Sequence, residues 1–467
     1  MADLAIFYDL ETSDQHPIGQ IMNFSFICVD RNFKITDEYS DQILLNRLQL
    51  PGPGAILANR IDVLKHQKES KETEKSAALK IAKFIDKQIQ IGKKVVFVGY
   101  NSSKFDLPFL RTTLIRNGIN PYFFGALVYK DLLFAARKLS VSNPDFPRLE
   151  SRSKKAGRGE EAPRVSLSLE TLTNHFGLLE GKQAHSSRED VVITIELAKL
   201  FAEKFKLNVF DYEPYEVSAL HTGSRQGKVY NSFYVNYEIP GSSHFTSTPM
   251  TLLDADHRYS LWIDLKKYGE GQGRKSISWF SQQASSFFSD KKEIADPSAG
   301  ELAKKALLEF KDLSLKNYFE ISSCDIEQDI YRLDMSMINS LFEVIWKNQI
   351  GSKSNFTKDA KIISLRHDLA NYEWGNKSDK QVEDLFRQYA LYRYGGKLRM
   401  NKFRDVPEPG KEIVDSYHVT LNELMRLCES PENNSNPEDK KLMKSLKDFY
   451  LKSDVYRLCM DKLEIAA

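Results

Sequence analysis

Apolar residues near the start of the chain recur with the two-residue period of β-strands. The segment "IFYDLET" at residues 6–12 is predicted as a buried strand, "MNFSFICVD" at 22–30 as a second, and "RNFK" at 31–34 as a turn into a third. The β-branched run "KKVVFVGY" at 93–100 predicts another strand, preceded by a helix over about 72–89. Strands interleaved with helices in this way predict an α/β domain with a mixed sheet.

Helical spacing returns towards the end of this first domain. From Asp190 onward apolar residues recur on one helical face, Ser186 and Ser187 precede them as candidate caps, and the helix is expected to end near Phe205. The stretch 141–164 is rich in Pro, Gly, Ser and charge and has no apolar period, so it predicts a mobile surface loop. Its basic side chains are either phosphate contacts or solvated surface charges. They are Arg152, Lys154, Lys155, Arg158 and Arg164.

The pattern changes twice in the rest of the chain. Short aromatic-rich runs separated by turn residues, from about 207 to 273, predict a small and mostly β domain. Beyond about residue 331 the period is helical, and a helix containing "LFRQYALYRY" is expected to end at Gly395-Gly396. We therefore predict three domains without internal repeats. Their ranges are 1–206, 207–330 and 331–467.

Composition narrows the class of protein only a little. A chain of 467 residues exceeds what one hydrophobic core supports, and 41% hydrophobic with 28% charged residues is ordinary for a globular protein. With 66 Lys and Arg against 64 Asp and Glu, net charge indicates no particular partner. Any site for a polyanion therefore has to come from local clustering of basic residues.

The cysteines and the apolar segments indicate in which cellular compartment the protein is expected. The four cysteines, Cys28, Cys324, Cys428 and Cys459, are widely separated and form no C-x-x-C pair, which argues against a zinc ribbon or a disulfide framework. The first ten residues contain no long apolar region, and no 18-residue apolar stretch follows. We expect a cytoplasmic protein with reduced thiols that is neither exported nor membrane-spanning.

Candidate chemistry begins with the two acids of the first strand. Because residues two apart in a strand share a face, Asp9 and Glu11 lie on one side, with Tyr8 and Leu10 on the other. Carboxylates about 6–7 Å apart repel each other unless a cation lies between them, so the pair is suited to bind a divalent metal ion. The alternative is a frayed strand end at which both acids meet water.

Two later segments supply partners for these acids. Asp106 follows a strand and a polar turn and lies near a helix start, where it is either a metal ligand or a structural cap. In "AHSSREDVV", His185 lies in a Ser-rich loop and Asp190 in the first turn of the following helix. A lone histidine of this kind is more often an exposed loop residue, so its interpretation depends on the surrounding acids.

Together these residues predict a metal-dependent hydrolytic site. The four carboxylates each lie at a strand end or a helix start, so they can converge at one end of the sheet. Hard oxygen ligands suit Mg²⁺ or Mn²⁺, and two such ions about 3.5–4 Å apart support in-line displacement at a phosphodiester. His185, with an ordinary pKa near 6.5, can then take a proton from the attacking water.

The segments "FYDLET", "GYNSSKFD" and "HSSRED" resemble, in this order, the three motifs of the DEDDh branch of the DnaQ-like 3′→5′ exonucleases. "LPGPGAILANRI" at 50–61 and "KDLLFAARKL" at 130–139 resemble exodeoxyribonuclease I in particular, as do "SALHTGSRQGKVYNSFYVNYEIP" and "LFRQYALYRY" in the later domains. The resemblance spans nearly the whole chain and is weakest at 266–331. It implies a ribonuclease H-like nuclease domain with a mixed sheet, then an SH3-like β domain and a helical C-terminal domain.

The resemblance also implies roles for single residues. Asp9, Glu11 and Asp190 would bind two Mg²⁺ ions, for which Mn²⁺ can substitute, Asp106 would hold a metal directly or through water, and His185 would activate the nucleophilic water. Leu10, Glu11 and Thr12 would lie beside the terminal nucleotide. The substrate would be single-stranded DNA, degraded from its 3′ end to nucleoside 5′-monophosphates in the bacterial cytoplasm. A monomer that meets the acidic tail of single-strand-binding protein is expected.

One position departs from the family pattern. Where better-known members carry an arginine that meets the substrate phosphate, this chain has Ser168. Either Arg164 or the basic residues of the 141–164 loop replace that arginine, or binding at this point is weaker. Elsewhere "KVYNSFYVNY", "HRYS" and "LKKY" are candidates for a track along the DNA, although most of their aromatic rings are expected in the core. The basic helix "RQYALYRYGGKLRMNKFR" is either a clamp, a dock for an acidic tail, or an ordinary solvated face.

Two other functions fit parts of this pattern. The same chemistry can act on RNA or on mispaired 3′ ends, although the two extra domains argue against a proofreading subunit. A nucleic-acid-binding scaffold without activity is disfavoured because all five acidic and histidine positions are present.

Overall fold

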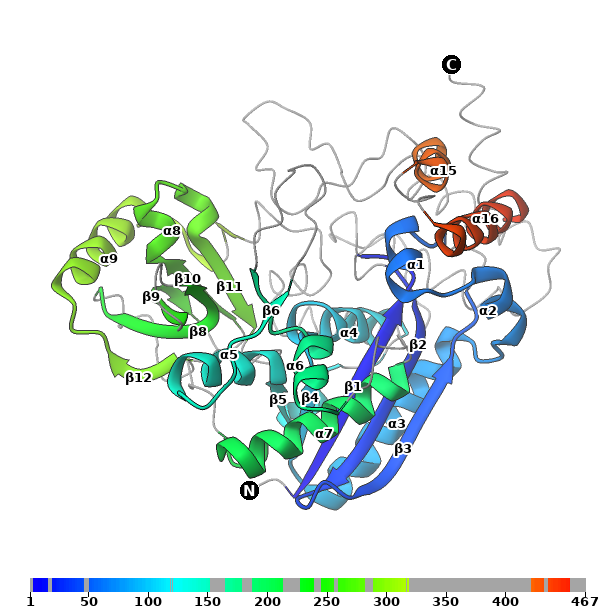
Figure 1. Cartoon of the computed structure of the whole chain (residues 1–467), viewed down its shortest axis with the longest axis horizontal. Coiled ribbons are helices and arrows are strands. Elements are labelled where there is room, and N and C mark those ends of the chain that lie inside the picture. Colours follow the sequence, from blue (N-terminus) through cyan, green and yellow to red (C-terminus); the bar gives the residue numbers. More distant parts are fainter. Residues whose placement is uncertain are drawn as a thin grey trace, which may run out of the picture.

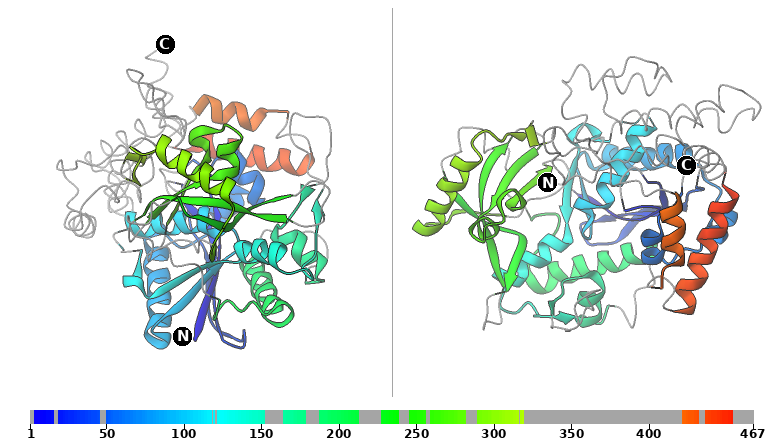
Figure 2. Two further views of the ribbon diagram at one scale, coloured as in Figure 1. Left: turned by 90° about the vertical axis from the view of Figure 1, so that its left-hand side faces the viewer. Right: turned by 90° about the horizontal axis from the view of Figure 1, so that it is seen from above.

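Figure 1 shows the computed structural model of the chain. The residues it describes are 3–15, 19–45, 50–117, 119, 121–151, 164–178, 187–212, 227–238, 245–255, 259–281, 289–315, 317–318, 421–431 and 436–453. Within them, a mixed sheet with helices forms the centre of the molecule. A second sheet and a pair of C-terminal helices lie on opposite sides of it (Figures 1 and 2).

The central sheet has five strands in the order β3-β2-β1-β4-β5. Strands β3, β2 and β1 pair antiparallel, whereas β1, β4 and β5 pair parallel. This confirms the predicted mixed sheet, and it places β1, with its two acids, at the centre. The strands are β1 (Leu4–Thr12), β2 (Ile21–Asp30), β3 (Ile35–Gln42), β4 (Val95–Gly99) and β5 (Leu127–Asp131).

Helices cover both faces of this sheet because β1 is apolar on both sides. Ile6, Tyr8 and Leu10 belong to one core with α3 and α4, whereas Ala5 and Phe7 belong to the other with α5 and α7. The period of two therefore sends even-numbered and odd-numbered side chains to different layers. The helices of this domain are α1 (Pro53–Asn59), α2 (Val63–Glu69), α3 (Glu74–Gly92), α4 (Asp106–Arg116), α5 (Leu132–Ser142), α6 (Leu169–His175) and α7 (Ser187–Phe205), with short 3-10 turns at Ser102–Lys104 and Phe123–Gly125.

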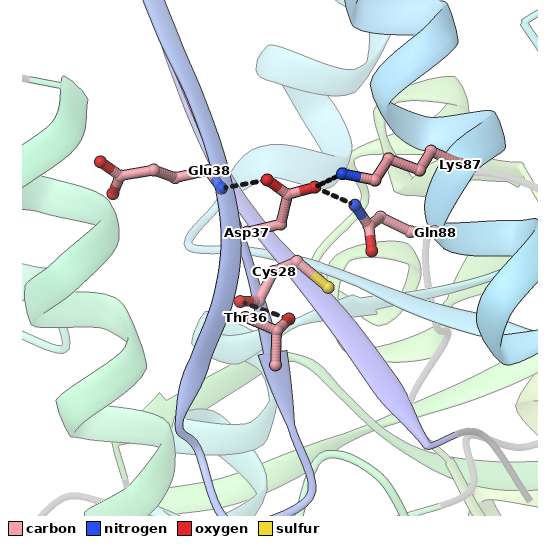
Figure 3. Close-up of polar contacts among 6 residues, drawn as sticks. All are labelled: Cys28, Thr36, Asp37, Glu38, Lys87 and Gln88. Atoms are coloured by element: carbon pink, nitrogen blue, oxygen red, sulfur yellow. Dashed lines mark hydrogen bonds and ion pairs between the residues drawn. The ribbon is translucent and has the colours of Figure 1, made fainter.

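A polar cluster joins α3 to the edge strand β3 (Figure 3). Lys87 and Gln88 both donate to Oδ2 of Asp37, at 2.9 and 2.6 Å. The helix itself begins with Thr73, whose side chain accepts a hydrogen bond from the amide of Ser76. The predicted helix over about 72–89 is thus confirmed, and its polar side holds the strand at the sheet edge.

The stretch 141–164 has more structure than the sequence predicted. Helix α5 extends to Ser142, and Phe146 is buried in the core beside α7. At the two ends of the stretch, β6 (Glu150–Ser151) pairs antiparallel with β7 (Arg164–Val165). The prediction of a loop without order was wrong for these parts, because Phe146 and two-residue strands leave no periodic signal. Arg152, Lys154, Lys155 and Arg158 lie outside the described residues.

The second sheet is antiparallel, with the strand order β11-β10-β9-β8-β12. Its strands β8 and β9 contact α5, which packs on the central sheet. The described aromatic residues Tyr230, Tyr259 and Tyr268 are buried in its cores, so these three rings are not free to stack on bases. The prediction of a mostly β region is confirmed, while its SH3-like character stays a prediction. Its elements are β8 (Val229–Glu238), β9 (Phe245–Ala255), β10 (Tyr259–Asp264), α8 (Leu265–Gly269), a 3-10 turn (Gly273–Ser276), β11 (Ile277–Ser281), β12 (Ser289–Glu293) and α9 (Pro297–Glu309).

The last described elements are two helices, α15 (Leu421–Glu429) and α16 (Pro437–Lys452). Helix α16 packs against α1 and α2 of the first domain (Figure 2). The helix predicted to end at Gly395-Gly396 lies outside the described residues, and so does the basic segment around it. Within the part of the chain that the structure describes, no helix has the length and apolar character needed to cross a bilayer.

Candidate active site

The end of β1 brings two carboxylates to the face of the sheet that α7 covers. Asp9 is partly buried, and Glu11 is 9% exposed. The Tyr8 and Leu10 side chains point into the opposite core, where the Tyr8 ring stacks on Phe97 with centroids 4.2 Å apart. The predicted division of the strand into an acidic and an apolar face is confirmed.

Helix α7 supplies the third acid. It begins at Ser187, at the pair of serines expected to cap it, so Asp190 lies in its first turn as predicted and is 4% exposed. One carboxylate oxygen from each of Asp9, Glu11 and Asp190 lies within 4.8 Å of the others. Strand β1 and helix α7 therefore build one cluster from two sequence segments about 180 residues apart.

Asp106 adjoins this cluster from the other side of β1. It is the first residue of α4, is 6% exposed, and its Oδ1 accepts a hydrogen bond of 3.2 Å from the amide of Leu10. That amide lies between Asp9 and Glu11 in the chain, so the bond ties the start of α4 to the acidic strand end. The contribution of Leu10 here is its main chain, because its side chain is in the core.

The clustering changes the acidity of these groups. Burial raises the pKa of Glu11 to about 8, and the negative charges of Asp190 and Asp106 add to the rise. Burial and the charges of Asp106, Glu11 and Asp190 raise the pKa of Asp9 well above its ordinary value. Burial raises the pKa of Asp106 to about 7, although its hydrogen bonds oppose the change. Without a cation, several of these acids cannot be ionised together at neutral pH.

The donor set fits a hard divalent cation. Carboxylate oxygens are the preferred ligands of Mg²⁺ and Mn²⁺, and the raised pKa values indicate that positive charge is lacking among these acids. Among the described residues, Asp9, Glu11 and Asp190 can share one ion, and Asp106 is close enough for its charge to raise the pKa of Asp9.

Stability should therefore depend on pH and metal together. A carboxyl whose folded pKa is raised stabilises the fold below its unfolded pKa, near 4.5 for Glu11, and this stabilisation is lost as pH rises through about 8. A cation offsets the loss, since it binds the ionised form. We expect the increase in melting temperature caused by 10 mM Mg²⁺ to grow steadily from pH 5.5 to 8. Calorimetry at constant ionic strength measures it, and an increase that shrinks with pH would contradict the assignment.

A further acid, Asp131, supports the loop that carries Asp106. It lies at the end of β5, is 1% exposed, and accepts hydrogen bonds from the amides of Asn101 (2.8 Å) and Ser103 (3.0 Å) and from the Ser103 hydroxyl (2.7 Å). It also caps α5 through the amide of Leu133. The sequence analysis assigned Asp131 no role, although an acid directly before "LLFAARKL" is a typical helix cap.

Asp131→Asn tests this support. The amide keeps one acceptor oxygen but turns a donor towards the amide of either Asn101 or Ser103, so the loop before Asp106 loses at least one backbone hydrogen bond. We expect Mn²⁺ affinity, measured by titration calorimetry, to fall by about 10- to 100-fold, as for other outer-shell partners of metal ligands. Asp37→Asn is the matched control, since among the described residues the carboxylate of this acid on β3 accepts hydrogen bonds from α3 and from the neighbouring Glu38 amide. Equal affinity in both variants would refute the supporting role.

The remaining predicted site residues have mixed outcomes. His185 lies outside the described residues. Thr12 is 2% exposed, and its hydroxyl donates to the main-chain oxygen of Asp14 at 2.8 Å. Ser168 caps α6 by accepting a bond from the amide of Thr171. The structure describes only the backbone of Arg164, which pairs with Ser151. Substrate contacts of Leu10, Glu11, Thr12 and Ser168 stay predictions.

Comparison with known proteins identifies the fold. No protein-family model and no curated protein sequence matches the chain. Solved structures do match over nearly the full length of both chains. A moderately thermophilic exonuclease I from Methylocaldum szegediense shares 15% identity with a TM-score of 0.62, covering 98% of this chain and 100% of the other. A zinc-bound complex of Escherichia coli ExoI with single-stranded DNA shares 17% identity with a TM-score of 0.56.

A third match is an ExoI/SSB-Ct complex, at 16% identity and a TM-score of 0.55, covering 97% of this chain and 99% of the other. The coverage of the zinc-bound complex is 96% and 99%. The fold of this chain is therefore the exonuclease I fold, as the motifs predicted.

Proposed function

We propose that this protein is a metal-dependent 3′→5′ exonuclease that degrades single-stranded DNA to nucleoside 5′-monophosphates in the cytoplasm. The observation that carries the proposal is the convergence of Asp9, Glu11 and Asp190 within 4.8 Å on an exonuclease I fold. The bound oligonucleotide of the E. coli ExoI complex supports single-stranded DNA as the substrate class.

Asp9, Glu11 and Asp190 would hold the catalytic metal ions, two Mg²⁺ in the family pattern, with Asp106 as a further or water-mediated ligand. When bound, such ions would neutralise charge on the reacting phosphate and lower the pKa of the attacking water. The zinc-bound ExoI complex supports divalent metal use in this fold. The rigid placement of Glu11 and Asp190 on a central strand and a helix would limit their movement during the reaction.

His185 would be the general base. It would accept a proton from the water that attacks the terminal phosphorus, a new phosphorus–oxygen bond would form, and the bond to the 3′ oxygen of the preceding nucleotide would break. The freed 3′ oxygen takes up a proton and becomes the new 3′ end. A histidine is suited to this role at neutral pH because its ordinary pKa lies near 6.5.

We also propose that the protein binds the acidic C-terminal tail of single-strand-binding protein. The ExoI/SSB-Ct complex, which aligns with this chain over nearly its full length, supports this partner. The predicted basic helix around Gly395-Gly396 is a candidate dock, because acidic tails favour clusters of Lys and Arg.

A degradation assay tests the function. A single-stranded DNA labelled at its 5′ end should shorten stepwise from the 3′ end with Mg²⁺ and not with EDTA, and the released products should be 5′-monophosphates. An RNA of the same sequence and a duplex with a mispaired 3′ end serve as comparisons. Faster cleavage of the RNA or of the mispaired duplex would show that single-stranded DNA is not the preferred substrate. Binding of all three without cleavage would refute the proposed enzymatic activity.

A further inference from the structure

Helix α1 is too short to be stable by itself. It spans seven residues, Pro53–Asn59, whereas isolated helices below about 12–15 residues are marginal in water. Its N-cap is Gly52, which has no side chain with which to cap the helix. Contacts from the rest of the molecule must therefore hold α1 in place.

The C-terminal helix α16 supplies contacts at both ends of α1. The hydroxyl of Tyr450, a fully buried residue, donates to the carbonyl oxygen of Pro51 just before the helix. At the other end, Asp439 of α16 forms an ion pair with Arg60. Beyond it, the Ser445 hydroxyl donates to Asp62 at 2.6 Å and accepts from the amide of Leu64 at 3.2 Å. Helix α16 thus fixes the path of the chain from Pro51 to Leu64.

The same segment also contacts the main chain at the end of β1. The amide of Gly52 donates to the carbonyl oxygen of Ser13 at 2.7 Å. The side-chain amide of Asn59 donates to the carbonyl oxygen of Thr12, also at 2.7 Å. The pairing of β1 with β2 is irregular between Glu11 and Thr12, so the regular ladder gives less support at this point. Directly after Glu11, hydrogen bonds from the α1 segment therefore support the main chain where the regular pairing of β1 with β2 ends.

We propose that Tyr450 is a positioning residue of the active site, which acts through α1 on the main chain that follows Glu11. This inference rests on the proposed function for its catalytic consequence, but the mechanical link from Tyr450 to Ser13 stands on the contacts alone. The Tyr450 hydroxyl donates to the buried carbonyl oxygen of Pro51, which loses this hydrogen bond when the hydroxyl is removed. The substitution should therefore loosen α1 while the ring keeps its packing.

The test uses the full-length protein with Tyr450→Phe, which deletes only the hydroxyl. Lys447→Met is the matched control, since Lys447 lies on the same helix and pairs with Glu429 of α15. Hydrogen exchange is measured over residues 50–59 and 10–15, together with Mn²⁺ affinity by titration calorimetry and kcat and KM on a single-stranded oligonucleotide.

In Tyr450→Phe we expect faster exchange in both segments, Mn²⁺ affinity lowered about 3- to 10-fold, and kcat/KM lowered to a similar extent. In Lys447→Met all three should stay within about twofold of the unmodified protein. Unchanged exchange in Tyr450→Phe overturns the inference whatever the activity. Faster exchange with unchanged Mn²⁺ affinity and kinetics also overturns it, because Tyr450 would then be only structural. An unmodified protein that leaves single-stranded DNA intact refutes the proposed function, while exchange and Mn²⁺ affinity still decide the role of Tyr450.

Discussion

Asp9→Asn should lower the rate of hydrolysis by at least about 10³-fold and should raise the stability of the metal-free protein. The rate falls because the cluster loses an anionic metal ligand, and a metal contributes several kcal/mol to stabilising charge in such reactions. The stability rises because burial, together with the charges of Asp106, Glu11 and Asp190, raises the pKa of Asp9 and so penalises its ionised form. An amide of the same size removes that repulsion and leaves the packing intact.

The two effects are measured separately. Single-turnover degradation of a labelled oligonucleotide with 10 mM Mg²⁺ gives the rate, and calorimetry in EDTA at pH 8 gives the melting temperature. Asp37→Asn is the control, because it makes the same chemical change on the same sheet at a carboxylate bound by Lys87 and Gln88 (Figure 3). This control should keep full activity and lose a little stability. An active Asp9→Asn protein would remove the basis of the metal assignment.

His185→Ala should slow the reaction by about 10²- to 10⁴-fold, the usual contribution of a general base. If the histidine accepts the proton, the rate of the unmodified protein should fall on the acid side of a pKa near 6.5, and the variant should lose this limb of the profile. DNA binding in Ca²⁺ should be unaffected, since the base acts on water and not on the strand.

The control for this variant is His175→Ala, which removes an exposed imidazole from α6. Its rate and pH profile should match those of the unmodified protein. Added imidazole should restore part of the activity of His185→Ala and leave His175→Ala unchanged. If the acid limb persists in His185→Ala, another group takes up the proton, and the role proposed for His185 is wrong.

The acids could be predicted from the sequence because each depends on local geometry. The two-residue period of β1 places Asp9 and Glu11 together, and a helix start places Asp190 in the first turn of α7. Asp106 follows the same logic at α4. The spacing of apolar residues does not predict the strand order β3-β2-β1-β4-β5. This order makes β1 central and so brings α4 and α7 to the same strand end.

The residues that sequence reasoning missed act over long separations. Asp131 binds amides about 30 positions earlier, and Tyr450 binds a carbonyl 399 positions earlier. Neither contact has a local signature, since a lone acid before a helix is an ordinary cap and a tyrosine in an amphipathic helix is an ordinary core residue. Such contacts become visible only when the chain is folded.

The distance between Pro51 and Tyr450 has a consequence for biosynthesis. A ribosome makes the first domain early, and domains generally fold as units in the order of their synthesis. The donor for the Pro51 carbonyl, however, is added only when 449 residues have already been joined. The segment after β1 therefore acquires its last support at the end of translation, so a nascent chain would carry the acids of β1 before it carries the helix that holds the segment behind them.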